Sequence, residues 1–157
     1  MAVSTKRAGT LKRPLRAEVD REPRSQYAAL PWRRTQDGQI EVLLISSRET
    51  RRWVIPKGWP MRRLKSPDCA SREAFEEAGV EGDVQRKKVG VFHYGKRLSS
   101  GRLQPVRVSV FALQVRRECE EFPEKGQRDR LWITPAQASV LVDEPELKIL
   151  IAGFQPA

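Results

Sequence analysis

The stretch GWPMRRLKSPDCASREAFEEAGV, from Gly58 to Val80, carries the most information about fold and chemistry. It predicts a helix of about three and a half turns, because good start and stop signals bracket it. Ser66 is a suitable N-cap, Pro67 suits the first turn, and Gly79 suits a left-handed C-terminal cap. The apolar and acidic positions between these signals follow the helical period, so we expect one face against the protein and one face available for chemistry.

Two stripes of side chains run along this predicted helix. Glu73, Glu76 and Glu77 fall within one arc of about 100°, and the adjacent arc holds three alanines small enough to let the helix lie close to a sheet. These alanines are Ala70, Ala74 and Ala78. Neighbouring carboxylates repel one another unless a hard cation such as Mg²⁺ binds them. A solvated acidic face, with Arg72 as a local counterion, is the alternative that spacing alone leaves open.

A basic loop leads into the acidic helix and favours the metal site over the solvated acidic face. It is broken by glycine and proline and contains four cationic residues, Lys57, Arg62, Arg63 and Lys65. Metal-assisted hydrolysis of a phosphate ester or anhydride needs this combination, since carboxylates hold the metal and cations bind the phosphate groups. We therefore expect Mg²⁺, with Mn²⁺ as an alternative, and substrate contacts from Lys57 and Arg62.

The rest of the chain alternates between strand and helix patterns. A mixed order of strands with only two or three helices predicts an α/β or α+β sandwich. Thr134 as N-cap and Pro135 at the first helical position predict the start of a second helix. The predicted strands are 27–32, 40–45, 53–55, 84–94, 106–115 and 131–133, with a polar loop over 95–104 and a final helix over 146–154.

Composition bounds the size and the surroundings of the protein. The chain has 157 residues, a net charge of +10, no apolar run long enough to cross a bilayer, and only two cysteines. One domain with reduced thiols in the cytoplasm is expected. The charge fits nucleic acid, an anionic membrane or a small polyanion. We favour a small polyphosphorylated substrate, with no membrane partner and no requirement for nucleic acid.

The N-terminal 24 residues differ in composition from the rest. They contain few large apolar residues and seven cationic ones, so we predict a mobile basic arm over 1–24 and a folded domain over 25–157. Docking of this arm on a phosphorylated ligand is an alternative role. The cations are Lys6, Arg7, Lys12, Arg13, Arg16, Arg21 and Arg24.

The motif after Lys57 resembles the signature of the Nudix hydrolases, G-x5-E-x7-R-E-U-x-E-E-x-G-U, where U is apolar. The matching residues are Gly58, Arg72, Glu73, Ala74, Glu76, Glu77, Gly79 and Val80. The resemblance implies a Nudix-type α/β/α sandwich with a central mixed sheet. One position departs from it, because Leu64 stands where the signature has its first glutamate. Arg72 therefore needs another acidic partner.

The resemblance also implies roles for individual residues. Glu73 and Glu77 match the principal metal ligands, together with the backbone carbonyl of Lys57. Glu76 matches a further ligand or the general base, and Arg72 belongs to the catalytic set. A later carboxylate often completes such a site, and the candidates are Glu118, Glu120, Glu121 and Glu124.

A narrower resemblance, to the diphosphoinositol polyphosphate phosphohydrolase branch, covers nearly everything from Gln26 to Phe154. It implies substrate contacts from Ser46, Ser47 and Arg48, and phosphate binding near Arg128 or Arg130. The basic residues of that branch at the first strand are replaced by Ser25, Gln26 and Tyr27.

The expected substrates are therefore dinucleoside polyphosphates, such as diadenosine hexaphosphate, or diphosphoinositol polyphosphates. Nucleoside diphosphate sugars and RNA 5′ ends are alternatives within the class. A non-catalytic basic module that binds nucleotide or nucleic acid is the alternative outside it.

Overall fold

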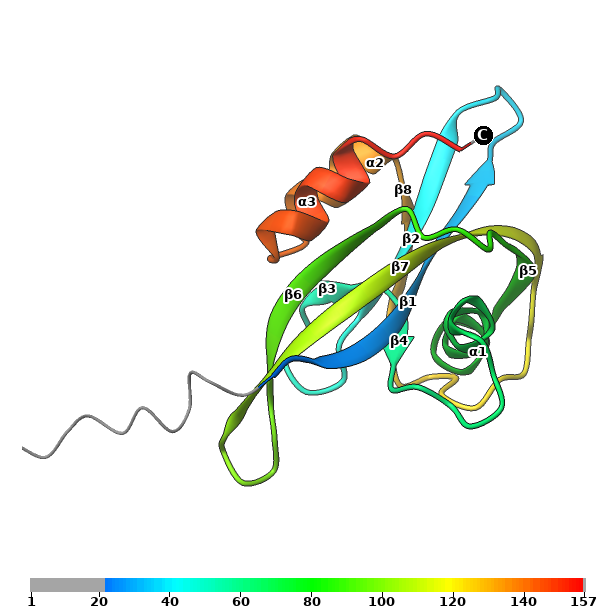
Figure 1. Cartoon of the computed structure of the whole chain (residues 1–157). Helices are drawn as coiled ribbons and strands as arrows, with labels where there is room; N and C mark the ends of the chain where they lie inside the picture. Colours follow the sequence, from blue (N-terminus) through cyan, green and yellow to red (C-terminus); the bar gives the residue numbers. More distant parts are fainter. Residues whose placement is uncertain (1–21, 157) are drawn as a thin grey trace, which may run out of the picture.

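An eight-stranded mixed sheet forms the centre of the computed structural model, which describes residues 22–156 (Figure 1). Strand β1 (Arg24–Arg34) runs parallel to β7 (Leu103–Glu118), and the other named strand pairs are antiparallel. The order β3-β2-β1-β7-β5 forms the main path, with β4 paired to β1, β6 to β7 and β8 to β2. The predicted mixed sheet is confirmed.

The remaining strands are shorter than β1 and β7. They are β2 (Ile40–Ser46), β3 (Trp53–Val54), β4 (Lys57–Gly58), β5 (Val80–Val84), β6 (Gly90–Arg97) and β8 (Arg130–Ile133). The prediction of one strand over 84–94 is wrong. The chain pairs with β7 twice, through β5 and then β6. The Gln85 amide still donates to the Ala112 carbonyl and the Val89 amide to the Val110 carbonyl, and the polar residues 86–88 lie between these two bonds. The predicted loop over 95–104 is correspondingly shorter, since β6 and β7 extend to Arg97 and Leu103.

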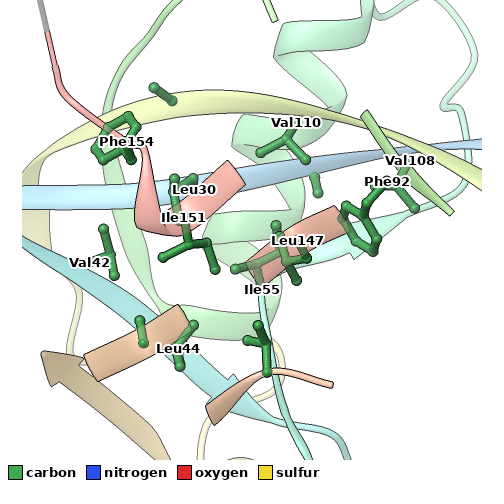
Figure 2. Close-up of a cluster of buried hydrophobic side chains, with 14 of the residues drawn as sticks. Leu30, Val42, Leu44, Ile55, Phe92, Val108, Val110, Leu147, Ile151 and Phe154 are labelled. Atoms are coloured by element: carbon green, nitrogen blue, oxygen red, sulfur yellow. The ribbon is translucent and has the colours of Figure 1, made fainter. Parts of the chain in front are cut away.

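Helices cover both faces of the sheet. Helix α1 (Ser66–Ala78) lies on one face, and α2 (Pro135–Leu141) and α3 (Pro145–Ala152) lie on the other (Figure 1). Since side chains alternate along a strand, β1 places Leu30 in the core under α2 and α3, and Ala29 in the core under α1. Figure 2 shows the first core, in which Leu147 and Ile151 of α3 pack with Leu30 and its neighbours. This is the predicted α/β/α sandwich.

Helix α1 packs on the sheet through its alanine stripe, as predicted. Ala70, Ala74 and Ala78 are fully buried. The predicted N-cap is wrong, because the helix begins at Ser66 and Lys65 is its N-cap, without a side-chain bond. The Cys69 amide donates to the Lys65 carbonyl and closes the first turn there, with Pro67 still within the first two positions.

Glycine is required at the other end of α1. Gly79 adopts a left-handed conformation with φ 67°, and its N–H donates to the carbonyls of Ala74 and Phe75. A Cβ atom at this position would overlap the ring of Phe122. The predicted C-terminal cap is therefore confirmed, and the same residue lets the 119–129 segment pass close to the end of the helix.

Local capping also determines where α2 starts. The Thr134 side chain accepts from the Gln137 amide, and the Gln137 side chain accepts from the Thr134 amide, which is a complete capping box.

Among residues 22–156, no helix is long and apolar enough to span a membrane. The predicted N-terminal arm lies outside the described residues up to position 21, and its last residue, Arg24, begins β1.

Candidate active site

Glu73 and Glu77 lie side by side in helical register on the face of α1 that borders β4. Both are buried, with 9% of each residue exposed. The carboxylate of Glu73 lies against the Cα of Gly58, and a Cβ atom at residue 58 would overlap it. Glycine at this point of the signature is therefore a steric requirement, because only glycine lets β4 and the Glu73 carboxylate approach so closely.

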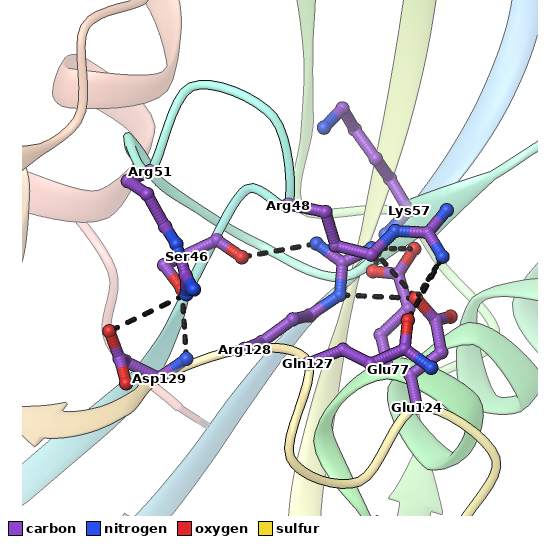
Figure 3. Close-up of polar contacts among 9 residues, drawn as sticks. All are labelled: Ser46, Arg48, Arg51, Lys57, Glu77, Glu124, Gln127, Arg128 and Asp129. Atoms are coloured by element: carbon purple, nitrogen blue, oxygen red, sulfur yellow. Dashed lines mark hydrogen bonds and ion pairs between the residues drawn. The ribbon is translucent and has the colours of Figure 1, made fainter.

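The Glu77 carboxylate is fixed by two partners from different elements. The backbone N–H of Lys57 donates to Oε2 at 3.2 Å, and the Arg128 guanidinium lies 3.4 Å from Oε1 (Figure 3). The first contact ties α1 to β4, and the second ties it to the segment before β8. Glu77 is thus oriented toward the strand whose backbone carbonyl is a predicted metal ligand.

Burial perturbs both carboxylates. Desolvation, followed by repulsion from Glu77, Glu76 and Glu124, raises the pKa of Glu73 to about 7. Desolvation also raises the pKa of Glu77 to about 7, against the opposing effect of Arg128 and of Lys57. Two buried carboxylates that resist ionisation side by side are suited to a divalent cation, since hard oxygen donors bind Mg²⁺. The chemistry of this donor set therefore fits the predicted metal.

Arg128 and Glu124 complete the surroundings of Glu77. Arg128 donates to Glu124 at 3.1 Å and to the Ser46 carbonyl at 3.1 Å, and only 9% of its side chain is exposed. Arg48 reaches the same Glu124 at 3.3 Å (Figure 3). Glu124 is thus the later carboxylate that the structure brings to the helix. The other candidates lie elsewhere: Glu118 bonds Trp132, Glu121 bonds Lys125, and Glu120 is exposed.

The third glutamate of the stripe is paired with an arginine of its own helix. Glu76 accepts from Nε of Arg72 at 3.1 Å, one helical turn back. This pair provides the acidic partner that Arg72 lacks at position 64, where Leu64 is exposed. Within residues 22–156, no three carboxylate, histidine or cysteine side chains are placed to hold an ion as they stand. The predicted convergence of all three glutamates is therefore not seen, since arginines bind two of them.

Ser46 is buried and binds backbone, whereas Ser47 is half-buried in an exposed turn. Ser46 is buried, and its hydroxyl accepts from the Asp129 amide at 2.8 Å. The Ser47 hydroxyl lies 2.6 Å from that of Thr50, inside a turn. Of the three residues predicted to contact substrate here, the structure exposes Arg48 next to the carboxylates and uses Ser46 to position the 128–130 segment.

Comparison with known proteins identifies the family of this chain. The profile described as the NUDIX domain matches residues 24–153. The chain belongs to the Nudix family. Nudix hydrolase 12 of Arabidopsis thaliana, described as mitochondrial, is 36% identical over 103 residues, covering 64% of this chain and 51% of the relative. The chain therefore spans about half the length of that relative.

Two further comparisons extend the similarity. Diphosphoinositol polyphosphate phosphohydrolase 3-alpha of Mus musculus is 32% identical over 112 residues, covering 69% of this chain and 63% of the relative. The Ap4A hydrolase of C. elegans superposes with a TM-score of 0.60 at 18% identity, covering 83% of this chain and 95% of that structure. The second comparison concerns the fold alone.

The other predicted basic residues lie around α1, which carries the signature and is called the Nudix helix below, at different depths. The Lys57 ammonium points away from Glu77 and lies 5.1 Å from the centroid of the Tyr94 ring, and burial lowers its pKa. Arg62 is exposed in the loop before α1. Arg130 donates to the Ala78 carbonyl at 3.0 Å and so supports the C-terminal end of the Nudix helix.

Sequence reasoning missed one charged residue near this site. Glu144, the N-cap of α3, is close enough to Lys57 to oppose the lowering of its pKa, and its Oε2 atom is buried without a hydrogen-bond partner among the described residues. No local pattern marks it, because only the packing of the α2–α3 connection on the sheet brings it to Lys57.

An open hollow lies beside the Arg128 side of the Nudix helix. It has a volume of about 520 Å³, and Lys125, Arg128, Arg130 and Phe122 are among the residues that line it. Glu118 and Glu120 line it as well, so acidic and cationic side chains and one aromatic ring share this hollow.

Proposed function

We propose that this chain hydrolyses a phosphoanhydride bond in a polyphosphorylated small molecule, with Mg²⁺ or Mn²⁺ as cofactor. The observation that carries the proposal is the buried pair Glu73 and Glu77, placed against β4 and bordered by Arg48 and Arg128. Carboxylates that hold a metal next to cations that bind phosphate are the two parts that metal-assisted phosphoryl chemistry needs. Membership of the Nudix family supports the same reaction class.

The residues divide the work as follows. Glu73, Glu77 and the carbonyl of Lys57 hold the cation, which supplies Lewis-acid chemistry at phosphate oxygens when bound. Glu76 is more exposed than these two carboxylates and takes the proton from the attacking water. Arg72 orients Glu76 through the 3.1 Å bond from its Nε.

Dinucleoside polyphosphates or diphosphoinositol polyphosphates are the proposed substrate class. Both carry a dense row of negative charge, which fits the net charge of +10 and the three cationic side chains among those that line the hollow. The names of two similar proteins, an Ap4A hydrolase and a diphosphoinositol polyphosphate phosphohydrolase, support these two classes. Phosphate groups held away from the cut position the reacting bond, and this positioning lowers the barrier.

A substrate screen tests the proposal. Phosphate release and product masses are measured with diadenosine polyphosphates, diphosphoinositol polyphosphates, nucleoside diphosphate sugars and capped RNA, each with Mg²⁺, Mn²⁺ or a chelator. We expect turnover of one of the first two groups, lost on chelation. Binding that weakens steeply with salt, needs no divalent cation and gives no product would instead indicate a non-catalytic polyanion-binding module.

A further inference from the structure

All three nitrogens of the Arg128 guanidinium contact acceptors inside the protein. Nε donates to Glu124 at 3.3 Å, Nη1 donates to the Ser46 carbonyl at 3.1 Å, and Nη2 reaches Glu124 at 3.1 Å and Glu77 at 3.4 Å. Each nitrogen of this group therefore already has an acceptor inside the protein and only 9% of the side chain is exposed, so its planar fork is not free to bind a phosphate in solution. In this arrangement Arg128 cannot also perform the phosphate-binding role predicted for it.

The same carboxylates face a second cation of the protein. Arg48 reaches Glu124 at 3.3 Å and Gln127 at 3.1 Å, so two guanidinium groups converge on Glu124. Arg48 is largely exposed, whereas Arg128 is buried. A divalent cation bound between Glu77 and its neighbours would meet the positive charge of Arg128 at close range, and like charges in a poorly solvated site repel strongly.

We propose that Arg128 is an exchangeable plug of the metal site, held on Glu77 and Glu124 until a divalent cation replaces it there. The guanidinium is then released to bind phosphate oxygens of the substrate, a role for which its planar fork is suited. The proposal rests on the proposed function in taking Mg²⁺ as the replacing cation. It makes metal binding and polyphosphate binding mutually reinforcing, because each ligand removes Arg128 from the position that opposes the other.

The backbone around Arg128 is built to permit this exchange without moving the segment. Ser46 binds Asp129 from both sides, since its amide donates to the Asp129 carbonyl at 3.0 Å and its hydroxyl accepts from the Asp129 amide at 2.8 Å. Residue 129 is therefore fixed to β2, and the side chain of residue 128 is the part that can turn. Ser46 acts here as a positioning residue.

Direct binding of Mn²⁺, measured by electron paramagnetic resonance without any phosphate, tests the plug. Removing the competing guanidinium in Arg128→Gln is expected to tighten Mn²⁺ binding about tenfold, since a charge-assisted hydrogen bond is worth roughly one such factor. Arg128→Lys, which keeps the charge but loses the fork, should give a smaller gain. Arg116→Gln is the control, because it also removes an arginine charge, but from an exposed side chain whose partner is Asp83 rather than Glu77 or Glu124. Unchanged or weaker Mn²⁺ binding in Arg128→Gln would overturn the proposal and make Arg128 a fixed support of Glu77.

A measurement on the unmodified protein remains decisive if Arg128→Gln does not fold. The Nε–H of Arg128, assigned in NMR spectra by its loss in Arg128→Lys, should exchange slowly with water before Mg²⁺ is added and at least about tenfold faster afterwards, once its bond to Glu124 is broken. Slow exchange that persists at saturating Mg²⁺ would contradict the plug. Plug behaviour without turnover of any substrate would refute only the proposed function, and turnover with weaker Mn²⁺ binding in Arg128→Gln would refute only the plug.

Discussion

One helix presents two stripes that serve opposite purposes. Ala70, Ala74 and Ala78 are fully buried and join the core formed with β1, β2, β5 and β7. Glu73 and Glu77, one position away on the same helix, are also buried, but they face β4 and an arginine and their pKa values are raised to about 7. The alanines pack the helix on the sheet. The glutamates are buried carboxylates whose negative charge is unfavourable until a cation compensates it.

The comparison shows why the glutamate stripe depends on its neighbours. Apolar contacts along the alanine stripe are favourable by themselves. Buried like charges are unfavourable until cations compensate them. Arg128 and Lys57 provide partial compensation for Glu77 from two other segments. Substitutions in the two stripes should therefore separate stability from activity.

Glu77→Gln should give the largest effect and mark the glutamate stripe as functional. We expect the rate of phosphate release to fall at least about 100-fold, because a metal ligand loses its charge, while the helical content stays unchanged. Glu121→Gln, at an exposed carboxylate paired with Lys125, serves as the control. Equal activity of the two variants would remove Glu77 from the site.

Ala74→Leu should have the complementary effect on the alanine stripe. Added atoms in a close-packed interface destabilise a protein by about 1–3 kcal/mol, which urea denaturation measures. The same change at the exposed Ala136 of α2 is the control and should be near neutral. No loss of stability in Ala74→Leu would show that α1 lies farther from the sheet than the structure places it.

Gly58→Ala tests the close contact between β4 and the Glu73 carboxylate of α1. The new methyl group overlaps the Glu73 carboxylate and must displace it, so we expect the Mg²⁺ concentration for half-maximal activity to rise about tenfold. Gly95→Ala in β6 is a matched control, since a Cβ atom there meets its nearest side-chain atom only at 3.7 Å. Similar Mg²⁺ dependence in both variants would contradict the steric requirement.

The pH dependence of stability gives the smallest expected effect. Glu73 and Glu77 have pKa values of about 7 in the folded protein, above the ordinary value of 4.5. The folded state therefore binds more protons between these values, and stability falls as pH rises from about 4.5 to 7. In chelator, Tm should decrease by about 3 °C or more over this window, and Mg²⁺ should reduce the decrease. If Tm instead rose with pH between about 4.5 and 7 in both the wild type and Glu77→Gln, the raised pKa values of Glu73 and Glu77 would be contradicted.

Much of the fold was predictable because its signals are local. The alanine period, Gly79 and the Thr134 cap each act within a few residues of their own position. The break between β5 and β6 was missed because an apolar alternation on both sides hides it. The N-cap was misplaced by one residue because Ser66 has the right chemistry, yet Lys65 has the cap conformation.

The site was predictable only in its helical half. The order of the glutamates and of Arg72 follows from helix geometry, and the Arg72–Glu76 pair has the i, i+4 spacing that favours it. The pairing of Glu77 with Arg128, the selection of Glu124, and the burial of Ser46 depend on how the 119–129 segment crosses α1. Such long-range contacts leave no periodic trace in one sequence.

Equilibrium binding of Mn²⁺ to the chain and to the double variant Glu73→Gln/Glu77→Gln tests the central claim most directly. The claim predicts one saturable site in the wild type and none in the double variant, with the same circular dichroism spectrum for both. Retention of that site at comparable affinity in the double variant would place the metal elsewhere and contradict the account.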